Sequence, residues 1–312
     1  MRAFIFPGQG SQAVGMGKML ADASPTARAV FEEVDHALGQ HLFKLMCEGP
    51  ESELMLTENA QAAIMANAIA TLRVLEVEGG IRLSEKCNFV AGHSLGEYTA
   101  LCAAGALPLA VTASLLKLRG RAMQAAVPVG IGAMAALLGA DIEKAESLSK
   151  AVAEGETCTV ANDNDPSQVV ISGHRGAIDR AIERAKEYGI KRGILLPVSA
   201  PFHCPLMQPA ADEMATALEA TTILAPLVPL YATVTAAPVV DPHLIAAQLI
   251  EPVTGRVRWR ESAIALAEAG VTHFVAFGGK VLGPMVKRSA GADVSTTSVI
   301  SMDDIEDLLS VI

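Results

Sequence analysis

The sequence predicts an α/β fold, in which a mainly parallel sheet is covered by helices on both faces and carries a smaller inserted unit. Short apolar strands alternate with helical segments along most of the chain, as is typical of such sheets. A chain of 312 residues, 51% of them apolar, is longer than one simple domain usually is. The middle of the chain has a different order of elements, which indicates that the insert lies there.

The first part of the chain alternates as this fold requires. A strand ends in the loop Pro7–Gln12, an alanine-rich helix ends at Gly79-Gly80, and Pro128 closes the last helix before the insert. The predicted elements are a strand at 3–6, helices at 26–38 and 58–78, a strand at 88–91, and helices at 97–104 and 110–126.

The middle of the chain has the order β-α-β-β-α-β, the split βαβ of a ferredoxin-like unit. Its predicted elements are a strand at 133–138, a helix at 141–153, strands at 157–161 and 168–171, a helix at 175–188 and a strand at 193–198. The run Asn162-Asp163-Asn164-Asp165-Pro166 predicts a turn between the two central strands, because these residue types favour turns.

After Pro201 the alternation of strands and helices resumes. The predicted elements are a helix at 204–220, a strand at 229–234, a helix at 258–269, a strand at 272–277 and a final strand and helix. We therefore expect a discontinuous main domain, residues 1–127 and 200–312, interrupted by a ferredoxin-like subdomain at 128–199.

Composition narrows the class of protein. A formal net charge of −10 argues against a general affinity for nucleic acid. Five scattered cysteines without C-x-x-C spacing indicate reduced thiols, with neither a disulfide framework nor a zinc site. The start of the chain does not fit a signal peptide, and no uninterrupted apolar run is long enough to span a membrane. We expect a cytoplasmic monomer with no nucleic-acid or membrane partner and no permanently bound cofactor or metal.

The most informative segment is Gly92-His93-Ser94-Leu95-Gly96, between a predicted strand and a predicted helix. A G-x-S-x-G sequence in that place forms a sharp turn, in which the glycines avoid Cβ collisions and the serine side chain projects outward. We predict that Ser94 is a nucleophile and that the amide of Leu95 faces the group that Ser94 attacks. A glycine-flanked serine in an ordinary turn is the alternative.

A nucleophilic serine needs a base, and His203 is the best placed of the seven histidines. It follows the last strand of the insert and precedes a helix, at a seam where clefts commonly form. Every aspartate between Ser94 and His203 falls inside the insert, so no acid completes a triad. We expect a Ser–His dyad whose imidazole is held by a backbone carbonyl, and we expect His93 to point away from the serine hydroxyl.

Two other motifs match known patterns only in part. Gly8–Ala13 follows a strand and matches the dinucleotide fingerprint G-x-G-x-x-G/A, but the acids beyond it lie in helical periodicity and no second strand follows. Ser114–Lys117 matches S-x-x-K, but it lies in the middle of a helix without the other motifs of penicillin-binding proteins.

Several motifs together resemble one family. They are Pro7–Gln12, Gly92–Glu97, Arg119-Gly120, Pro201–Cys204 and Phe277–Leu282. In this order they closely resemble the malonyl-CoA:acyl carrier protein transacylases of bacterial fatty-acid synthesis, from Phe4 to about Arg288. The resemblance implies an α/β-hydrolase-like core with a ferredoxin-like insert. It also implies a ping-pong reaction, in which malonyl passes from coenzyme A to Ser94 and then to the phosphopantetheine thiol of acyl carrier protein.

The resemblance implies roles for single residues of the catalytic machinery. Ser94 would be the nucleophile, and His203 the base that takes its proton and later activates the incoming thiol. The backbone amides of Gln9 and Leu95 would form the oxyanion hole.

It implies roles in substrate binding as well. Arg119 would hold the free carboxylate of malonyl by a two-pronged hydrogen bond, and Met123, one turn on, could line the acyl pocket. Leu95 and Phe202 resemble the residues of malonyl-selective relatives. In many relatives a glutamine before the tryptophan of a late helix orients the histidine through its main-chain carbonyl, and Arg258 stands at that position here.

The implied partner, acyl carrier protein, is acidic, as this chain is, so docking requires a local positive patch. The candidates are Lys191, Arg192, Lys280, Lys287 and Arg288. A serine hydrolase on the same elbow is the main competing interpretation, and a transacylase of polyketide synthesis or a malonate decarboxylase is another. Arg119 and the missing acid favour transfer over hydrolysis.

Overall fold

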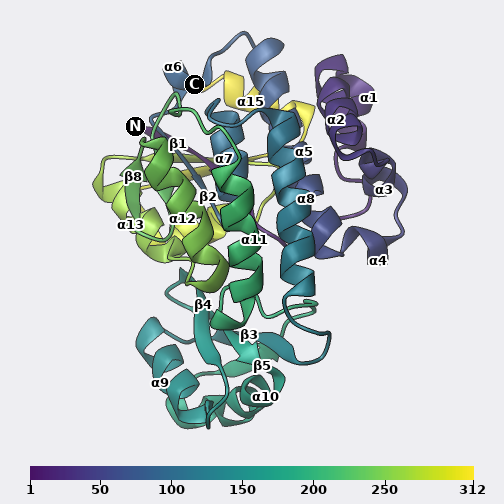
Figure 1. Cartoon of the computed structure of the whole chain (residues 1–312). Helices are drawn as coiled ribbons and strands as arrows, with labels where there is room; N and C mark the ends of the chain where they lie inside the picture. Colours follow the sequence, from purple (N-terminus) through teal and green to yellow (C-terminus); the bar gives the residue numbers. More distant parts are fainter.

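The computed structural model describes all residues, 1–312, and contains two separate sheets (Figure 1). The larger sheet has the strand order β10-β9-β1-β2-β7-β8, and all its neighbouring pairs are parallel except β7 and β8. Its strands are β1 (Arg2–Phe6), β2 (Phe89–Gly92), β7 (Leu230–Ala232), β8 (Ala237–Val239), β9 (His273–Phe277) and β10 (Ser295–Val299). The mixed α/β class with a parallel-rich sheet is confirmed.

Helices cover both faces of the larger sheet. Along β1, Phe4 and Phe6 belong to one apolar cluster while Ala3 and Ile5 belong to another, and all four are fully buried. This explains why the strand is apolar throughout rather than alternating. The helices around this sheet are α1 (Lys18–Ala23), α2 (Pro25–Leu38), α3 (Leu42–Glu48), α4 (Glu51–Leu54), α5 (Thr57–Val77), α6 (Leu83–Lys86), α7 (Gly96–Ala103), α8 (Leu109–Ala125), α11 (Gln208–Glu219), α12 (Pro242–Thr254), α13 (Trp259–Glu268), α14 (Leu282–Ala290) and α15 (Met302–Leu309).

The second sheet is antiparallel and lies at one end of the molecule, at the bottom of Figure 1. Its strands are β3 (Gly132–Leu138), β4 (Cys158–Asp165), β5 (Gln168–His174) and β6 (Arg192–Leu195), in the order β4-β5-β3-β6. Helices α9 (Ile142–Val152) and α10 (Arg175–Arg184) pack on it and share an apolar cluster with it. This face of the small sheet therefore has a core of its own, whereas Met134 and Ala136 of β3 pack in a cluster shared with α8 and α11.

Strand β4 differs from the prediction. The expected turn at 162–166 is wrong for its first four residues, because β4 continues to Asp165 and the chain turns only at the next two positions. Its acids bind the main part of the molecule instead: Asp163 pairs with Arg260 at 3.0 Å and Asp165 with Arg288 at 2.7 Å. Both carboxylates are at most 1% exposed, and removing the partner of such a buried charge typically costs about 3–5 kcal/mol.

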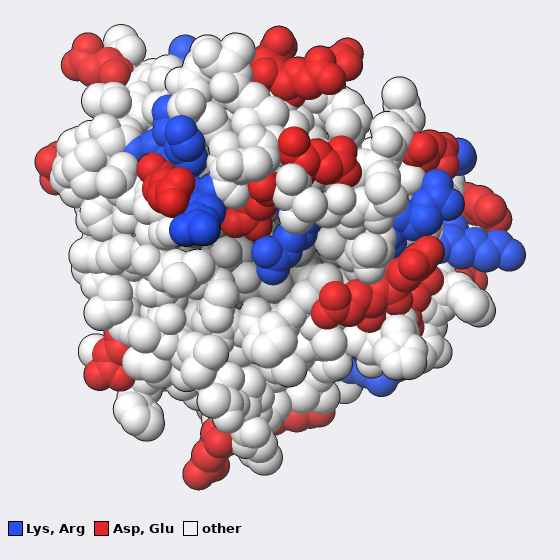
Figure 2. Space-filling model, turned by 90° about the horizontal axis from the view of Figure 1, so that it is seen from above, with Lys and Arg blue, Asp and Glu red and all other residues white.

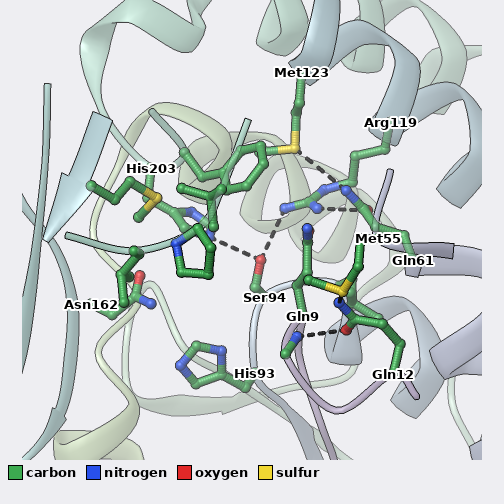
Figure 3. Close-up of a pocket in the computed structure, with 17 residues that line it drawn as sticks. Gln9, Gln12, Met55, Gln61, His93, Ser94, Arg119, Met123, Asn162 and His203 are labelled. Carbon is green, nitrogen blue, oxygen red and sulfur yellow. Dashed lines mark hydrogen bonds between the residues drawn. The ribbon is translucent and has the colours of Figure 1, made fainter. Parts of the chain in front are cut away.

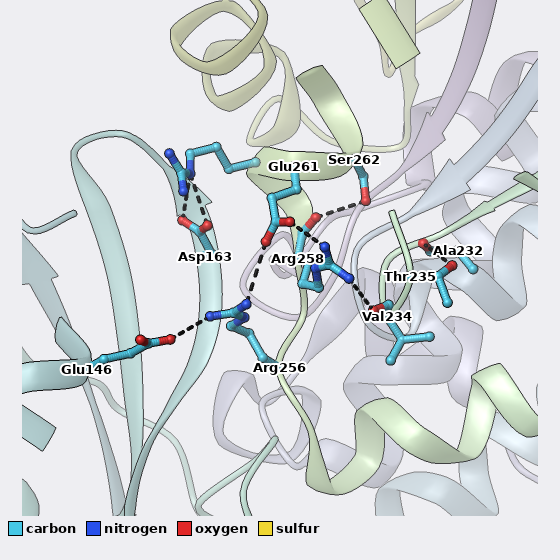
Figure 4. A network of polar contacts seen from close by, with 10 residues as sticks. Glu146, Asp163, Ala232, Val234, Thr235, Arg256, Arg258, Glu261 and Ser262 are labelled. Atoms are coloured by element: carbon cyan, nitrogen blue, oxygen red, sulfur yellow. Dashed lines mark hydrogen bonds and ion pairs between the residues drawn. The ribbon is translucent and has the colours of Figure 1, made fainter. Parts of the chain in front are cut away.

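One further ion pair joins the two parts beside β4, and it belongs to a small network (Figure 4). Arg256, in the segment before α13, bonds Glu146 of α9 at 2.9 Å and lies 3.6 Å from Glu261 of α13. Glu261 also pairs with Arg258. The orientation of the small sheet relative to the large one thus depends on charged contacts as well as on apolar packing.

Helix α5 is long and apolar enough to cross a membrane by length and composition alone, but 83% of its most apolar window is buried inside the protein. It lies in the largest apolar cluster and packs against α8 (Figure 1). Such burial is that of a core helix.

Candidate active site

Ser94 lies in a sharp turn between β2 and α7. Its φ is +56°, a left-handed conformation that is uncommon for a residue with a Cβ. A Cβ on Gly92 would lie 1.8 Å from the carbonyl carbon of Gly96, and one on Gly96 would lie 2.2 Å from the carbonyl oxygen of Phe6. Only glycine therefore fits at either position, and the predicted elbow geometry is present.

His203 faces Ser94 across the pocket (Figure 3). Its Nε2 lies 2.9 Å from Ser94 Oγ, and its Nδ1 is hydrogen-bonded to the main-chain carbonyl of Pro252 in α12. A carbonyl only accepts, so Nδ1 carries the proton and Nε2 is free to accept the serine hydroxyl. The expected dyad held by a backbone carbonyl is present, but the expectation that Arg258 supplies the carbonyl is wrong. The carbonyl of Arg258 accepts from Ser262 in α13 instead, 2.9 Å away.

The environment keeps the imidazole neutral. Burial, together with the positive charge of Arg119, lowers the pKa of His203 to about 3, although the bond to Pro252 acts in the opposite direction. The φ of His203 is +59°, so both members of the dyad occupy left-handed backbone conformations. Strain of this kind concentrates at functional sites.

Arg119, on α8, is buried beside the dyad with 3% of its surface exposed. One terminal nitrogen donates to Ser94 Oγ at 3.2 Å, and the other donates to Gln61 Oε1 at 2.8 Å. Its guanidinium carbon lies 5.8 Å from the ring centre of Tyr98. No carboxylate contacts the guanidinium, and the Nε of Arg119 has no hydrogen-bond partner. Burial lowers the pKa of Arg119.

These side chains line a cavity of about 220 Å³ whose walls come from both parts of the molecule. The main part contributes Gln9, Leu95, Met123, Phe202 and the dyad, so every predicted site residue except Arg258 lines it. The small sheet and the segment after β6 contribute Met134, Asn162 and Leu196–Val198.

The loop that matches the dinucleotide pattern is part of this cavity. Gly10 N–H donates to Gln12 Oε1 at 2.7 Å, and Gln9 Nε2 donates to Thr57 at the start of α5. A Cβ on Gly8 would lie 2.7 Å from the carbonyl oxygen of His93, so the loop lies directly against the elbow. The backbone amides of Gln9 and Leu95 donate no hydrogen bond within the protein.

The roles of three polar residues at the site, Gln61, Asn162 and His93, were not predicted from the sequence. Gln61 holds Arg119, and Asn162 places a buried, unpartnered Oδ1 at the cavity. His93, to which no role was given, lies 2.8 Å through Nε2 from Asn164 Oδ1 of β4. Only Gln61 left a signal in the sequence, as a polar residue inside an alanine-rich helix.

Glu97 was also missed, although it lies in the elbow motif. It is 2% exposed and accepts hydrogen bonds from the N–H and the hydroxyl of Thr233, at 2.6 and 3.0 Å. Burial raises the pKa of Glu97 to about 7, and the two bonds from Thr233 oppose that rise. The contact attaches the first turn of α7 to the segment after β7.

Comparison with known proteins places this site in a family. Residues 3–278 match the acyl transferase domain family. The malonyl CoA-acyl carrier protein transacylase of Bacillus subtilis is 45% identical over 288 residues, which cover 92% of this chain and 89% of that protein. The acyl-carrier-protein S-malonyltransferase of Bartonella henselae has the same fold, with a TM-score of 0.96, 49% identity and coverage of 99% and 98%.

A third relative was solved together with a partner protein. It is a malonyl-transacylase in complex with the holo acyl carrier protein of a type II polyketide synthase, with a TM-score of 0.95, 37% identity and 99% of both chains covered. The family match, the identities and the shared fold extend over nearly the whole chain. The chain therefore belongs to the malonyl-CoA:acyl carrier protein transacylase family, and the protein is an acyltransferase.

Proposed function

We propose that this enzyme transfers malonyl from malonyl-CoA to the phosphopantetheine thiol of acyl carrier protein by a ping-pong mechanism, supplying fatty-acid synthesis. The observation that carries the proposal is the buried guanidinium of Arg119, 3.2 Å from Ser94 Oγ and without a carboxylate partner. A buried cation of this kind is stabilised by an anion that arrives with the substrate. Malonyl carries such an anion at the end of its acyl group, whereas acetyl does not.

In the first half-reaction, His203 Nε2 takes the proton of Ser94, and Oγ attacks the thioester carbonyl carbon. The amides of Gln9 and Leu95, which have no other acceptor, are available for the oxyanion, a contribution on the order of 3 kcal/mol for each donor. The C–S bond breaks, the imidazolium returns its proton to the coenzyme A sulfur, and malonyl-Ser94 remains. Arg119 holds the malonyl carboxylate throughout.

The second half-reaction reverses these roles. The neutral imidazole takes the proton of the phosphopantetheine thiol, and the thiolate attacks the ester carbonyl of malonyl-Ser94. The C–O bond breaks, and the proton passes from His203 to Ser94 Oγ. Because the pKa of His203 is lowered, the imidazole is in its neutral form at neutral pH, which is the form that can accept this proton.

The same site bears on the competing interpretations. A serine hydrolase uses the same elbow, but its triad carries an acid on the histidine, whereas His203 bonds a backbone carbonyl here. The polyketide alternative stays open, since one relative was solved with a polyketide acyl carrier protein. We also propose the domain division 1–127 with 200–312, α/β-hydrolase-like, and 128–199, ferredoxin-like. The strand order β4-β5-β3-β6 supports the second part.

The nucleophile can be tested directly. Mixing the enzyme with malonyl-CoA should add one malonyl group to Ser94, detected by mass spectrometry of the intact protein and its peptides. Ser94→Ala should show no adduct. Ser114→Ala, which removes the exposed S-x-x-K serine of α8, should acylate normally. An adduct that persists in Ser94→Ala would refute the assignment.

The pH dependence follows from the low pKa of His203. Because a pKa of about 3 leaves the imidazole neutral, kcat/KM for acylation by malonyl-CoA should show no acid limb from His203 between about pH 8 and pH 5, and Glu97→Gln identifies any change in this range that comes from the Glu97 carboxyl. An ordinary histidine, with a pKa of about 6.5, would make the rate fall about tenfold per pH unit below that value. Rapid-quench mass spectrometry of the adduct measures the rate at each pH. An acid limb centred near the ordinary value would contradict the neutral, buried base.

Selectivity for malonyl should depend on Arg119. Losing a buried charge pair costs about 3–5 kcal/mol, so Arg119→Ala should lower kcat/KM for malonyl-CoA about a hundredfold or more. Acetyl-CoA never had the contact, so its kcat/KM should stay level or rise. Arg121→Ala is the matched control, because Arg121 lies on the same helix with its side chain 65% exposed. An unchanged ratio of malonyl to acetyl activity in Arg119→Ala would favour the hydrolase interpretation.

Docking of the acidic carrier protein should depend on exposed basic residues. Lys191, Arg192, Lys280 and Lys287 are exposed and form no ion pair, whereas Arg288 pairs with buried Asp165 and is unsuitable for charge reversal. Gly279, next to Lys280, packs against Pro7 and Ser11 of the loop that carries Gln9. At the opposite end of the molecule, acidic and basic side chains are intermixed (Figure 2).

Lys280→Glu with Lys287→Glu should therefore slow transfer to the carrier protein about tenfold or more while acylation by malonyl-CoA is unaffected. The pair Lys191→Glu with Arg192→Glu tests the second group. A control with Arg82→Glu and Lys86→Glu, at α6, changes the net charge equally at the far end. The two half-reactions are measured separately by mass spectrometry. Equal loss in both half-reactions would contradict a docking role.

A further inference from the structure

Helix α8 carries two arginines that form hydrogen bonds to different residues of helix α5. A Cβ on Gly120 of α8 would lie 2.5 Å from the Cα of Glu58, so the two helices are in close contact there. On the outer side of this contact, Arg121 bonds the carboxylate of Glu58 at 2.8 Å. On the inner side, Arg119 bonds the amide oxygen of Gln61 at 2.8 Å. Helix α5 thus neutralises one arginine and leaves the charge of the other uncompensated.

The orientation of the Gln61 amide is fixed by its two neighbours. A guanidinium has only donors, so the amide oxygen must face Arg119. The amide nitrogen then faces the sulfur of Met123, a weak acceptor 3.7 Å away. Gln61 is 1% exposed and lies at the cavity wall, so it is confined to this arrangement (Figure 3).

We propose that Gln61 is a positioning residue that sets acyl selectivity: it orients the guanidinium of Arg119 toward Ser94 without neutralising it. This inference rests on the proposed function. A glutamate has the same shape and would hold Arg119 equally well, but it would supply a permanent carboxylate to the cation that malonyl needs. An apolar residue would leave the charge free but unoriented. A neutral acceptor meets both requirements.

Two substitutions separate charge from orientation. Gln61→Glu should lower kcat/KM for malonyl-CoA about a hundredfold, because its carboxylate competes with that of malonyl, and should leave acetyl-CoA within about threefold. Gln61→Met, of similar volume, should lower kcat/KM for malonyl-CoA by about tenfold, because no side chain then orients the guanidinium of Arg119. The readout is the ratio of malonyl to acetyl kcat/KM. A variant that merely folds badly loses both activities together.

The matched control is Glu58→Gln, which makes the inverse exchange one turn earlier on α5, outside the cavity. It should leave the ratio unchanged. The double variant Arg119→Ala with Gln61→Glu should show the same ratio as Arg119→Ala alone, since the introduced carboxylate then has no cation to neutralise.

The outcomes distinguish this inference from the function on which it rests. If Arg119→Ala changes the ratio but Gln61→Glu does not, the proposal for Gln61 is overturned and the role of Arg119 stands. If neither changes it, Arg119 does not select the acyl group at all. If Gln61→Glu lowers malonyl and acetyl activity equally, Gln61 has only a structural role.

Discussion

The site is organised around one buried positive charge. Arg119 contacts an amide, a hydroxyl and an aromatic ring but no carboxylate, and the charged group that acts on it from a greater distance is the buried Glu97. Its charge helps to keep His203 unprotonated and partly offsets the desolvation of Glu97. One buried cation therefore acts on both titratable groups beside it, the imidazole of His203 and the carboxyl of Glu97.

Close contacts hold the backbone of Ser94 and His203 in strained conformations. Ser94 and His203 both have positive φ, and neither is a glycine. The elbow is confined by Gly92 and Gly96, where any side chain would collide with the backbone, and His203 is held by the carbonyl of Pro252. These surroundings hold the hydroxyl and the imidazole within hydrogen-bond distance of each other.

The features that can be predicted from the sequence are those set by residues close together along the chain. All strands of the main sheet except β8, together with the elbow and the pairing of Ser94 with His203, were predicted, since apolar runs, glycine spacing and a histidine between a strand and a helix can be read directly from the sequence. The end of β4 was missed because Asp163 and Asp165 have partners 97 and 123 residues away. The carbonyl that holds His203 was assigned to Arg258 instead of Pro252, because every residue type has a main-chain carbonyl and the sequence does not mark which one is used. Gln61 was missed because its partner lies 58 residues away.

The cavity has one wall on the main part of the molecule and one on the small sheet, and this has a consequence for how its shape can be altered. Ser94, His203 and Arg119 come from the main part, whereas Asn162 and Met134 come from strands β4 and β3 of the small sheet. The two walls are joined by the ion pairs beside β4 and by an apolar cluster that contains both Met134 and Met123. Substitutions along this junction would shift one wall of the cavity relative to the other without replacing Ser94, His203 or Arg119, and they offer protein engineering a way to alter the space beside these side chains.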